Sequence, residues 1–123
     1  MVKIETLVFV HKEDEILLAM KKGRFGEGRY NGFGGKKEEQ DKTLRDCAIR
    51  ETEEEAKIRV KNLSYMGRIL FKFLDSEEDD HEVHIYDTSE YEGDPEETEE
   101  MCPQWFKKNN MPYDEMWSAD RYW

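Results

Sequence analysis

Residues 31–35 read NGFGG, and residues 50–55 read RETEEE. If residues 43–56 form a helix, then Glu51, Glu54 and Glu55 stand at positions i, i+3 and i+4 and share one face. Three carboxylates on one face repel one another unless a cation lies among them, and Mg²⁺ takes oxygen ligands of this kind. The pattern therefore predicts a helix that holds Mg²⁺ beside a polyphosphate, next to a glycine-rich turn.

The composition of the chain is that of one small acidic domain. Its 123 residues fit a single domain over 1–123, and its net charge of −11 argues against nucleic acid as a direct partner, because phosphate backbones select basic surfaces. No apolar run approaches the length of a membrane span, and the N-terminus has no signal-peptide pattern. Cys47 and Cys102 are expected to be free thiols. We expect a monomeric, cytoplasmic protein that does not bind membranes.

Local patterns predict a chain of strands around one helix. Residues 21–35 are rich in glycine and are expected to form a loop, and Asp41 or Thr43 can cap the helix that follows. The predicted strands cover residues 2–10 and 16–20, which form a hairpin, then 58–60, 63–74, 83–88 and a stretch that ends at 105–106. Residues 114–123 begin a second helix. The acidic runs at 77–80 and 96–100 are expected to be solvated loops, with Glu100 as an exception.

The glycine-rich stretch and the acidic helix together resemble the Nudix box. Gly35 is followed by Arg50-Glu51, Glu54-Glu55 and Ile58 in the order of that motif. Three positions and one spacing depart from it. The box glutamate is Asp41, eight residues rather than seven separate it from Arg50, Thr52 replaces an apolar residue, and Lys57 replaces the glycine that usually stops the helix. The alternative is a solvated helix face with an ordinary Arg50–Glu54 pair, but the neighbouring glycines favour the box.

The resemblance extends over essentially the whole chain. Residues 21–36, 101–106 and 111–123 are similar to the MutT-type oxidised purine nucleoside triphosphatases, such as 8-oxo-dGTP diphosphatases. This family implies an α/β (α+β) Nudix fold, in which helices sandwich a mixed β-sheet. The family chain continues beyond the residues that match Tyr122-Trp123, so we expect the C-terminal elements to be missing here.

The resemblance also implies a metal site and a reaction. Its metal ligands would be Glu51, Glu54, Glu55, Glu100 and the carbonyl of Gly35. Glu51, Glu54 and Glu100 would be the catalytic carboxylates, and Arg50 would orient them. The expected cofactor is Mg²⁺, with Mn²⁺ as an alternative. The family reaction is attack of water on a nucleoside triphosphate, which yields the monophosphate and pyrophosphate and sanitises the nucleotide pool.

A base pocket is implied as well. Trp117 offers a face for stacking on a purine, and Asn31 can both donate to and accept from a base edge. The family has two adjacent acids where this chain has Ala119 and Asp120, so its choice of base is open. Core packing is the alternative role for Phe71 and Phe73, and plain exposure for Lys21. The full predicted set is Thr6, Lys21, Asn31, Phe71, Phe73, Trp117 and Asp120.

Three functions remain open on the sequence alone. The first is a Mg²⁺-dependent pyrophosphohydrolase of oxidised purine nucleoside triphosphates. The second is a Nudix hydrolase of another nucleoside diphosphate derivative, against which Trp117 and Asp120 argue. The third is a catalytically weak or inactive Nudix-like binding module, or a designed or reduced scaffold. The altered box spacing, Ala119 and the early stop favour it, and the intact glutamates oppose it.

Overall fold

The fold is organised around one central hairpin. The computed structural model describes residues 2–21, 30–71, 80–99 and 101–109. Strand β1 (Lys3–Lys12) turns at residues 13–14 into β2 (Glu15–Lys21), which pairs with it antiparallel. Residues 6–10 of β1 are all buried, because the strand has neighbours on both edges and packed side chains on both faces. The predicted hairpin is confirmed.

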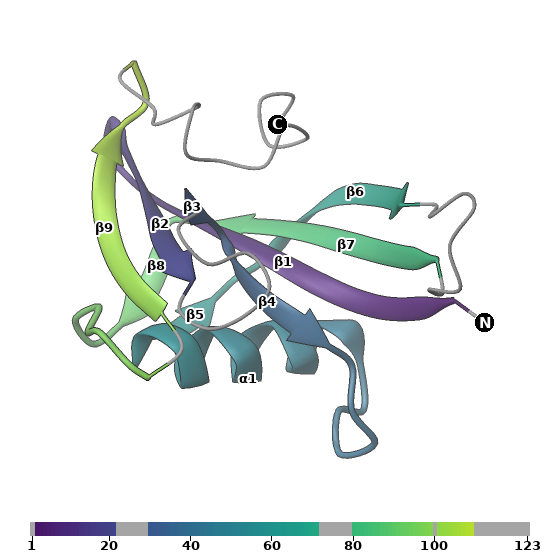
Figure 1. Ribbon diagram of the computed structural model, residues 1–123. Helices are drawn as coiled ribbons and strands as arrows, with labels where there is room; N and C mark the ends of the chain where they lie inside the picture. Colours follow the sequence, from purple (N-terminus) through teal and green to yellow (C-terminus); the bar gives the residue numbers. More distant parts are fainter. Residues whose placement is uncertain (1, 22–29, 72–79, 100, 110–123) are drawn as a thin grey trace.

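The sheet built on this hairpin is mixed (Figure 1). Its strand order is β3-β2-β1-β7-β6, while β4 also pairs with β1 and β9 with β2. The β1–β7 pair is parallel and the other pairs are antiparallel. The remaining strands are β3 (Tyr30–Asn31), β4 (Phe33–Lys36), β6 (Ser64–Phe71), β7 (His81–Thr88) and β9 (Met101–Lys107), and a separate pair joins β5 (Arg59–Lys61) to β8 (Glu90–Glu92).

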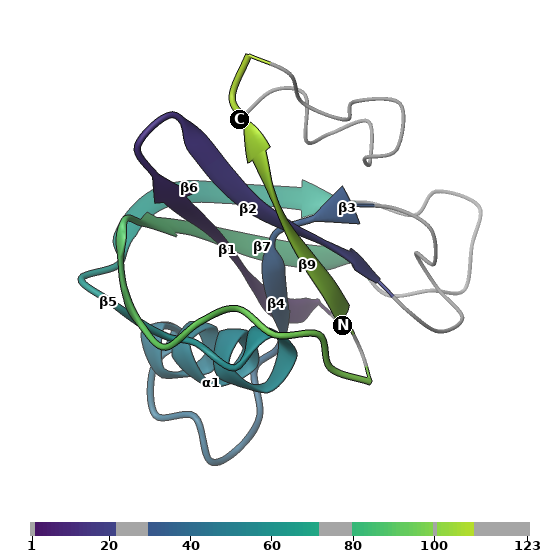
Figure 2. The ribbon, with the colours of Figure 1, turned by 90° about the vertical axis from the view of Figure 1, so that its left-hand side faces the viewer.

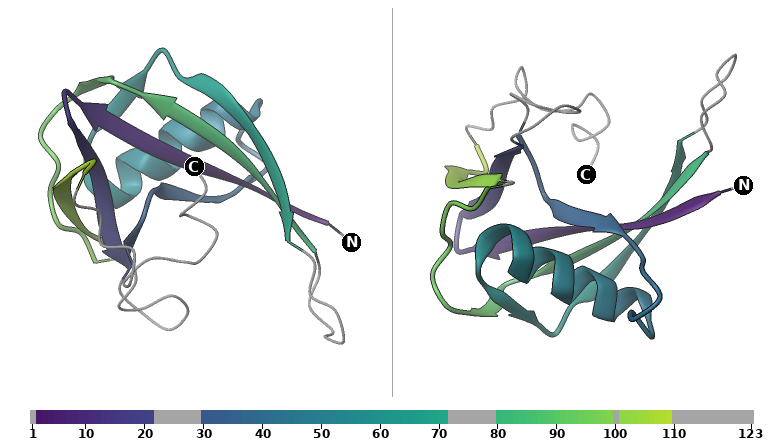
Figure 3. Two further views of the ribbon diagram at one scale, coloured as in Figure 1. Left: turned by 90° about the horizontal axis from the view of Figure 1, so that it is seen from above. Right: turned by 60° about the horizontal axis from the view of Figure 1, so that its bottom comes forward.

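Helix α1 (Leu44–Ala56) covers one face of the sheet (Figures 2 and 3). Thr43 caps its start, with its hydroxyl accepting from the Asp46 N–H at 3.1 Å. The expectation that Lys57 removes the left-handed helix stop is wrong. Lys57 itself adopts φ 63° and ψ 24° and donates its N–H to Glu53 O at 2.9 Å, so the helix ends as it would at a glycine.

Two apolar clusters lie on the two faces of the sheet. The first fills the space beneath α1 and includes Val8, Val10, Phe33 and Ala48. The second lies on the opposite side, which we call the far face, and its buried residues are Leu7, Phe9, Ile16, Leu18 and Ile85. Alternate residues of β1 therefore serve both clusters, as strand geometry requires.

The predicted loop over residues 21–35 is wrong at its C-terminal end, where β3 and β4 form. The glycines there serve close backbone packing: a Cβ on Gly34 would lie 1.8 Å from the backbone oxygen of Thr6. Strand β8 was not predicted. The helix predicted from residue 114, which would supply the second layer of the sandwich, lies outside the described residues. No helix in the described part is long and apolar enough to cross a membrane.

Candidate active site

The candidate site lies where α1 meets β4. Strand β4 pairs with β1, placing Gly35 opposite Thr6 and Gly34 opposite Leu7. The Gly34 N–H donates to Glu55 Oε1 at 2.8 Å. A Cβ on Gly35 would lie 2.7 Å from the carboxyl carbon of Glu51, so only glycine leaves room for that carboxylate. Two of the three predicted glutamates are thus packed directly against the glycine pair.

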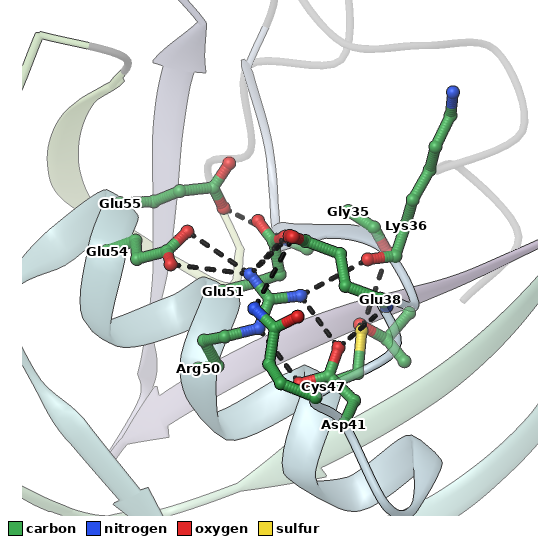
Figure 4. Close-up of polar contacts among 12 residues, drawn as sticks. Gly35, Lys36, Glu38, Asp41, Cys47, Arg50, Glu51, Glu54 and Glu55 are labelled. Carbon is green, nitrogen blue, oxygen red and sulfur yellow. Dashed lines mark hydrogen bonds and ion pairs between the residues drawn. The ribbon is translucent and has the colours of Figure 1, made fainter.

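Arg50 gathers the acidic groups of the site around one guanidinium (Figure 4). It binds both oxygens of Asp41, from Nε at 2.9 Å and from a terminal nitrogen at 2.8 Å. Its other terminal nitrogen contacts Glu51 Oε1 at 2.9 Å, Glu38 at 3.1 Å and Glu54 at 3.3 Å. Such bidentate, charge-assisted contacts fix side-chain orientation well.

Asp41 reaches Arg50 although one extra residue separates the two in the sequence. The Glu38 N–H donates to Asp41 Oδ2 at 2.9 Å, and the Asp41 N–H donates to Glu38 O at 3.0 Å. This tight turn holds the Asp41 carboxylate in place beside Arg50. Hydrogen bonding to Arg50 lowers the pKa of Asp41 to about 2, and Asp41 in turn raises the pKa of Arg50.

The predicted metal ligands are close neighbours but do not form a ready-made cluster. In the ranges that the structure describes, no three acidic, histidine or cysteine side chains are gathered closely enough to hold a metal ion. Glu51 and Glu54 both contact Arg50, whereas Glu55 contacts Gly34. The donors themselves, carboxylates and the Gly35 carbonyl, are the hard oxygen ligands that suit Mg²⁺. Glu100 lies outside the described residues.

Cys47, for which the sequence predicted only a free thiol, is part of the site. Its Sγ lies 3.4 Å from Thr6 Oγ1 and donates to Gly35 O at 3.7 Å. Burial raises the pKa of the Cys47 thiol, which therefore stays protonated and able to donate. One side chain thus links α1 to both β1 and β4. A single cysteine in a helix carries no motif from which this contact could have been foreseen.

The acidic stretch before β9 is anchored to the end of α1. Thr98 Oγ1 donates to Glu55 O at 3.0 Å, and the Glu96 N–H donates to Ala56 O at 2.9 Å. These contacts satisfy carbonyls that a helix end leaves unpaired. Glu96, Glu97 and Glu99 are exposed, as expected for a solvated loop, but the loop as a whole is held against the helix that carries the glutamates.

The predicted pocket residues are only partly brought together. Thr6 is 2% exposed and faces Cys47 on the helix side of the sheet. Phe71 shares its face with Ile69, which packs on the far face, so Thr6 and Phe71 lie on opposite sides. Asn31 pairs with Ala19, and its side chain accepts from the Gly32 N–H. The side chain of Lys21, at the end of β2, and residues Phe73, Trp117 and Asp120 lie outside the described part.

Comparison with known proteins identifies the family. Residues 1–123 match the NUDIX domain model. The chain is 44% identical over 121 residues to the oxidized purine nucleoside triphosphate hydrolase of Mus musculus and 42% identical over 121 residues to that of Danio rerio, covering 98% of this chain and 76% of each relative. A MutT NUDIX hydrolase structure from Burkholderia pseudomallei superimposes with a TM-score of 0.86 at 18% identity, covering 98% of this chain and 94% of that one, which shows a shared fold. The chain belongs to the Nudix family.

Proposed function

We propose that this protein is a Mg²⁺-dependent hydrolase that converts oxidised purine nucleoside triphosphates to the monophosphate and pyrophosphate. The observation that carries the proposal is the packing of Glu51 and Glu55 against Gly34 and Gly35, with Arg50 contacting Glu51 and Glu54. The activity named for the mouse and zebrafish relatives supports the choice of substrate. A nucleotide partner rather than nucleic acid also fits the net charge of −11. We propose that a single chain is the active unit.

The residues that would hold Mg²⁺ are Glu51, Glu54, Glu55 and the Gly35 carbonyl, with Glu100 as a further ligand. A bound divalent ion would lower the pKa of a water ligand and neutralise phosphate charge. Arg50 keeps Asp41 ionised and holds Glu51 in place through direct hydrogen bonds. Glu54 is half exposed, and within the described ranges its side chain contacts only Arg50, at 3.3 Å, so it can exchange that partner most easily.

The Gly35 carbonyl is held by two independent contacts. Its residue pairs with Thr6 in the β1–β4 ladder, and the Cys47 thiol donates to its oxygen. Residues on three elements therefore fix the orientation of this one carbonyl. Because the ladder and the helix are both part of the buried core, the carbonyl is prearranged before any ligand binds.

The decisive experiment is a pyrophosphate-release screen of normal and oxidised nucleoside triphosphates, with Mg²⁺ and with a chelator. We expect release from oxidised purine nucleotides only when Mg²⁺ is present. Glu54→Gln removes one charge at nearly constant volume and should abolish most turnover while leaving the circular dichroism spectrum unchanged. Glu53→Gln, on the adjacent exposed position of α1, is the matched control and should retain normal turnover.

Two results would count against the proposal. Near-normal turnover by Glu54→Gln would show that these glutamates are not the metal site. Absence of hydrolysis of every nucleotide, despite measurable nucleotide binding, would instead favour the Nudix-like binding module.

A further inference from the structure

Asn31 is followed by a glycine that the fold requires. Asn31 ends β3 and Phe33 begins β4, with Gly32 between the two strands. A Cβ on Gly32 would lie 2.5 Å from the Val8 backbone oxygen and 3.1 Å from the Phe9 ring, so a side chain fits there only if β1 moves. Close packing against β1 therefore fixes an Asn-Gly step in the chain, independently of any role for the asparagine.

The Asn31 side chain is held against the next peptide nitrogen. Its Oδ1 accepts from the Gly32 N–H at 2.8 Å, and the side chain makes no other hydrogen bond to a residue that the structure describes. Because Cγ is bonded to Oδ1, this contact also keeps the carboxamide carbon close to the Gly32 nitrogen. Two groups that a fold holds near contact distance react faster than groups that must first find each other. The contact therefore brings together the two atoms whose bonding starts deamidation.

We propose that Asn31 is a site of spontaneous deamidation in the folded protein. The Gly32 nitrogen, after losing its proton to hydroxide, attacks Cγ of Asn31 and forms a succinimide ring. The Cγ–Nδ2 bond breaks, and Nδ2 takes a proton from water and leaves as ammonia. Water then adds to either ring carbonyl, and the ring opens to aspartate or isoaspartate. Glycine has no side chain to hinder the attack, so Asn-Gly is especially prone to this reaction.

Deamidation would change a residue of the predicted base pocket. Asn31 pairs with Ala19, which belongs to the cluster beneath α1, so Asn31 lies on the same side of the sheet as the glutamates of α1. An amide can both donate and accept, whereas a carboxylate only accepts and adds a negative charge. This consequence rests on the proposed function: discrimination between bases should decline as the protein ages.

The test follows the exchange of amide for acid by mass spectrometry, in native protein and in protein unfolded by guanidinium chloride. Trypsin releases Asn31 and Asn62 in separate short peptides, each without another amide side chain. Asn62 is the matched control, because the bulky Leu63 follows it and its amide nitrogen donates to Glu90 at 2.6 Å. We expect native protein to convert Asn31 about tenfold faster than Asn62 or more, and no more slowly than unfolded protein does.

Two results would overturn the modification site. Conversion of Asn31 in the unfolded protein alone would mean that the folded contact protects the amide. Conversion at the same rate as Asn62 would mean that the contact with Gly32 gives no advantage. The rate at Asn31 should also rise with pH, because the attacking nitrogen must first lose its proton, and a rate independent of pH would contradict the mechanism.

Asn31→Asp tests the consequence for base recognition. Its ratio of kcat/KM for an oxidised purine nucleoside triphosphate to that for the unoxidised one should differ about tenfold from the wild-type ratio, the value of one lost hydrogen bond. An unchanged ratio would overturn that consequence. If the wild-type protein hydrolyses no nucleotide, the proposed function fails, whereas mass spectrometry still decides whether Asn31 is modified.

Discussion

At the scale of single residues, Asp41 shows how one ion pair links stability to pH. Its folded-state pKa is lowered to about 2 from 3.8 by hydrogen bonding to Arg50. A lowered pKa contributes stability that is fully present above the unfolded value and is lost as the pH falls through the folded one. The contribution of this pair should therefore fade between about pH 4 and pH 2.

Asp41→Asn tests that linkage directly. We expect the free energy of unfolding at pH 7 to fall by roughly 1–3 kcal/mol, because a charged hydrogen-bond partner of Arg50 is lost. The difference from the wild type should shrink towards zero as the pH approaches 2. Urea unfolding at several pH values measures it, with the exposed Glu53→Gln as the control. A difference that stays constant down to pH 2 would contradict the assigned pair.

The two cysteines should differ sharply in reactivity. Cys47 is buried, and burial raises its thiol pKa, whereas Cys102 is exposed. Since the thiolate is the reactive form, a thiol-specific reagent should modify Cys102 rapidly in the native protein and Cys47 only on unfolding. Mass spectrometry of peptides from native and urea-treated protein checks this. Rapid native labelling of Cys47 would show that the β1–β4–α1 contact opens readily.

At the scale of elements, local sequence patterns predicted the helix and strands whose stabilising contacts are themselves between residues close in the sequence. The β1–β2 hairpin and α1 follow from alternation, capping and helical spacing, and the glutamate face was predicted from the same spacing. Strands β4 and β8 depend on distant partners. Gly34 is needed because β1 passes too close for a Cβ, and β8 exists because it pairs with β5. The Arg50–Asp41 ion pair and the contacts of Cys47 likewise join residues that are apart in the sequence, and no sequence pattern indicated them.

Lys57, at the end of α1, provides a test of backbone strain. Lys57 holds a left-handed conformation that costs a residue with a Cβ roughly 1–2 kcal/mol relative to glycine. Lys57→Gly should therefore raise the free energy of unfolding by roughly 0.5–1 kcal/mol, after allowing for the greater unfolded-state freedom of glycine. Lys57→Ala keeps the Cβ and should bring no gain. Thermal unfolding followed at 222 nm compares the two, and equal stability of both variants would contradict the strain.

At the scale of the whole molecule, the net charge of −11 sets how a polyanionic substrate can bind. An acidic protein repels a triphosphate at long range, so binding should depend on a cation that bridges the two. We therefore expect a nucleoside triphosphate with a methylene group between its α and β phosphorus atoms, which resists cleavage, to stabilise the protein only together with Mg²⁺. At a free ligand concentration one hundred times Kd the gain is about 2.7 kcal/mol.

Thermal unfolding in four mixtures tests this dependence: protein alone, with Mg²⁺, with the nucleotide analogue and a chelator, and with both ligands. Ionic strength is matched with KCl, so that screening of the net charge is the same in each. The Tm should rise strongly only in the last mixture, and Glu54→Gln should lose most of that rise because one ligand of the bridging ion is gone. An equal rise in the presence of the chelator would mean that the nucleotide binds through the protein alone, and that the glutamate face of α1 does not mediate its recognition.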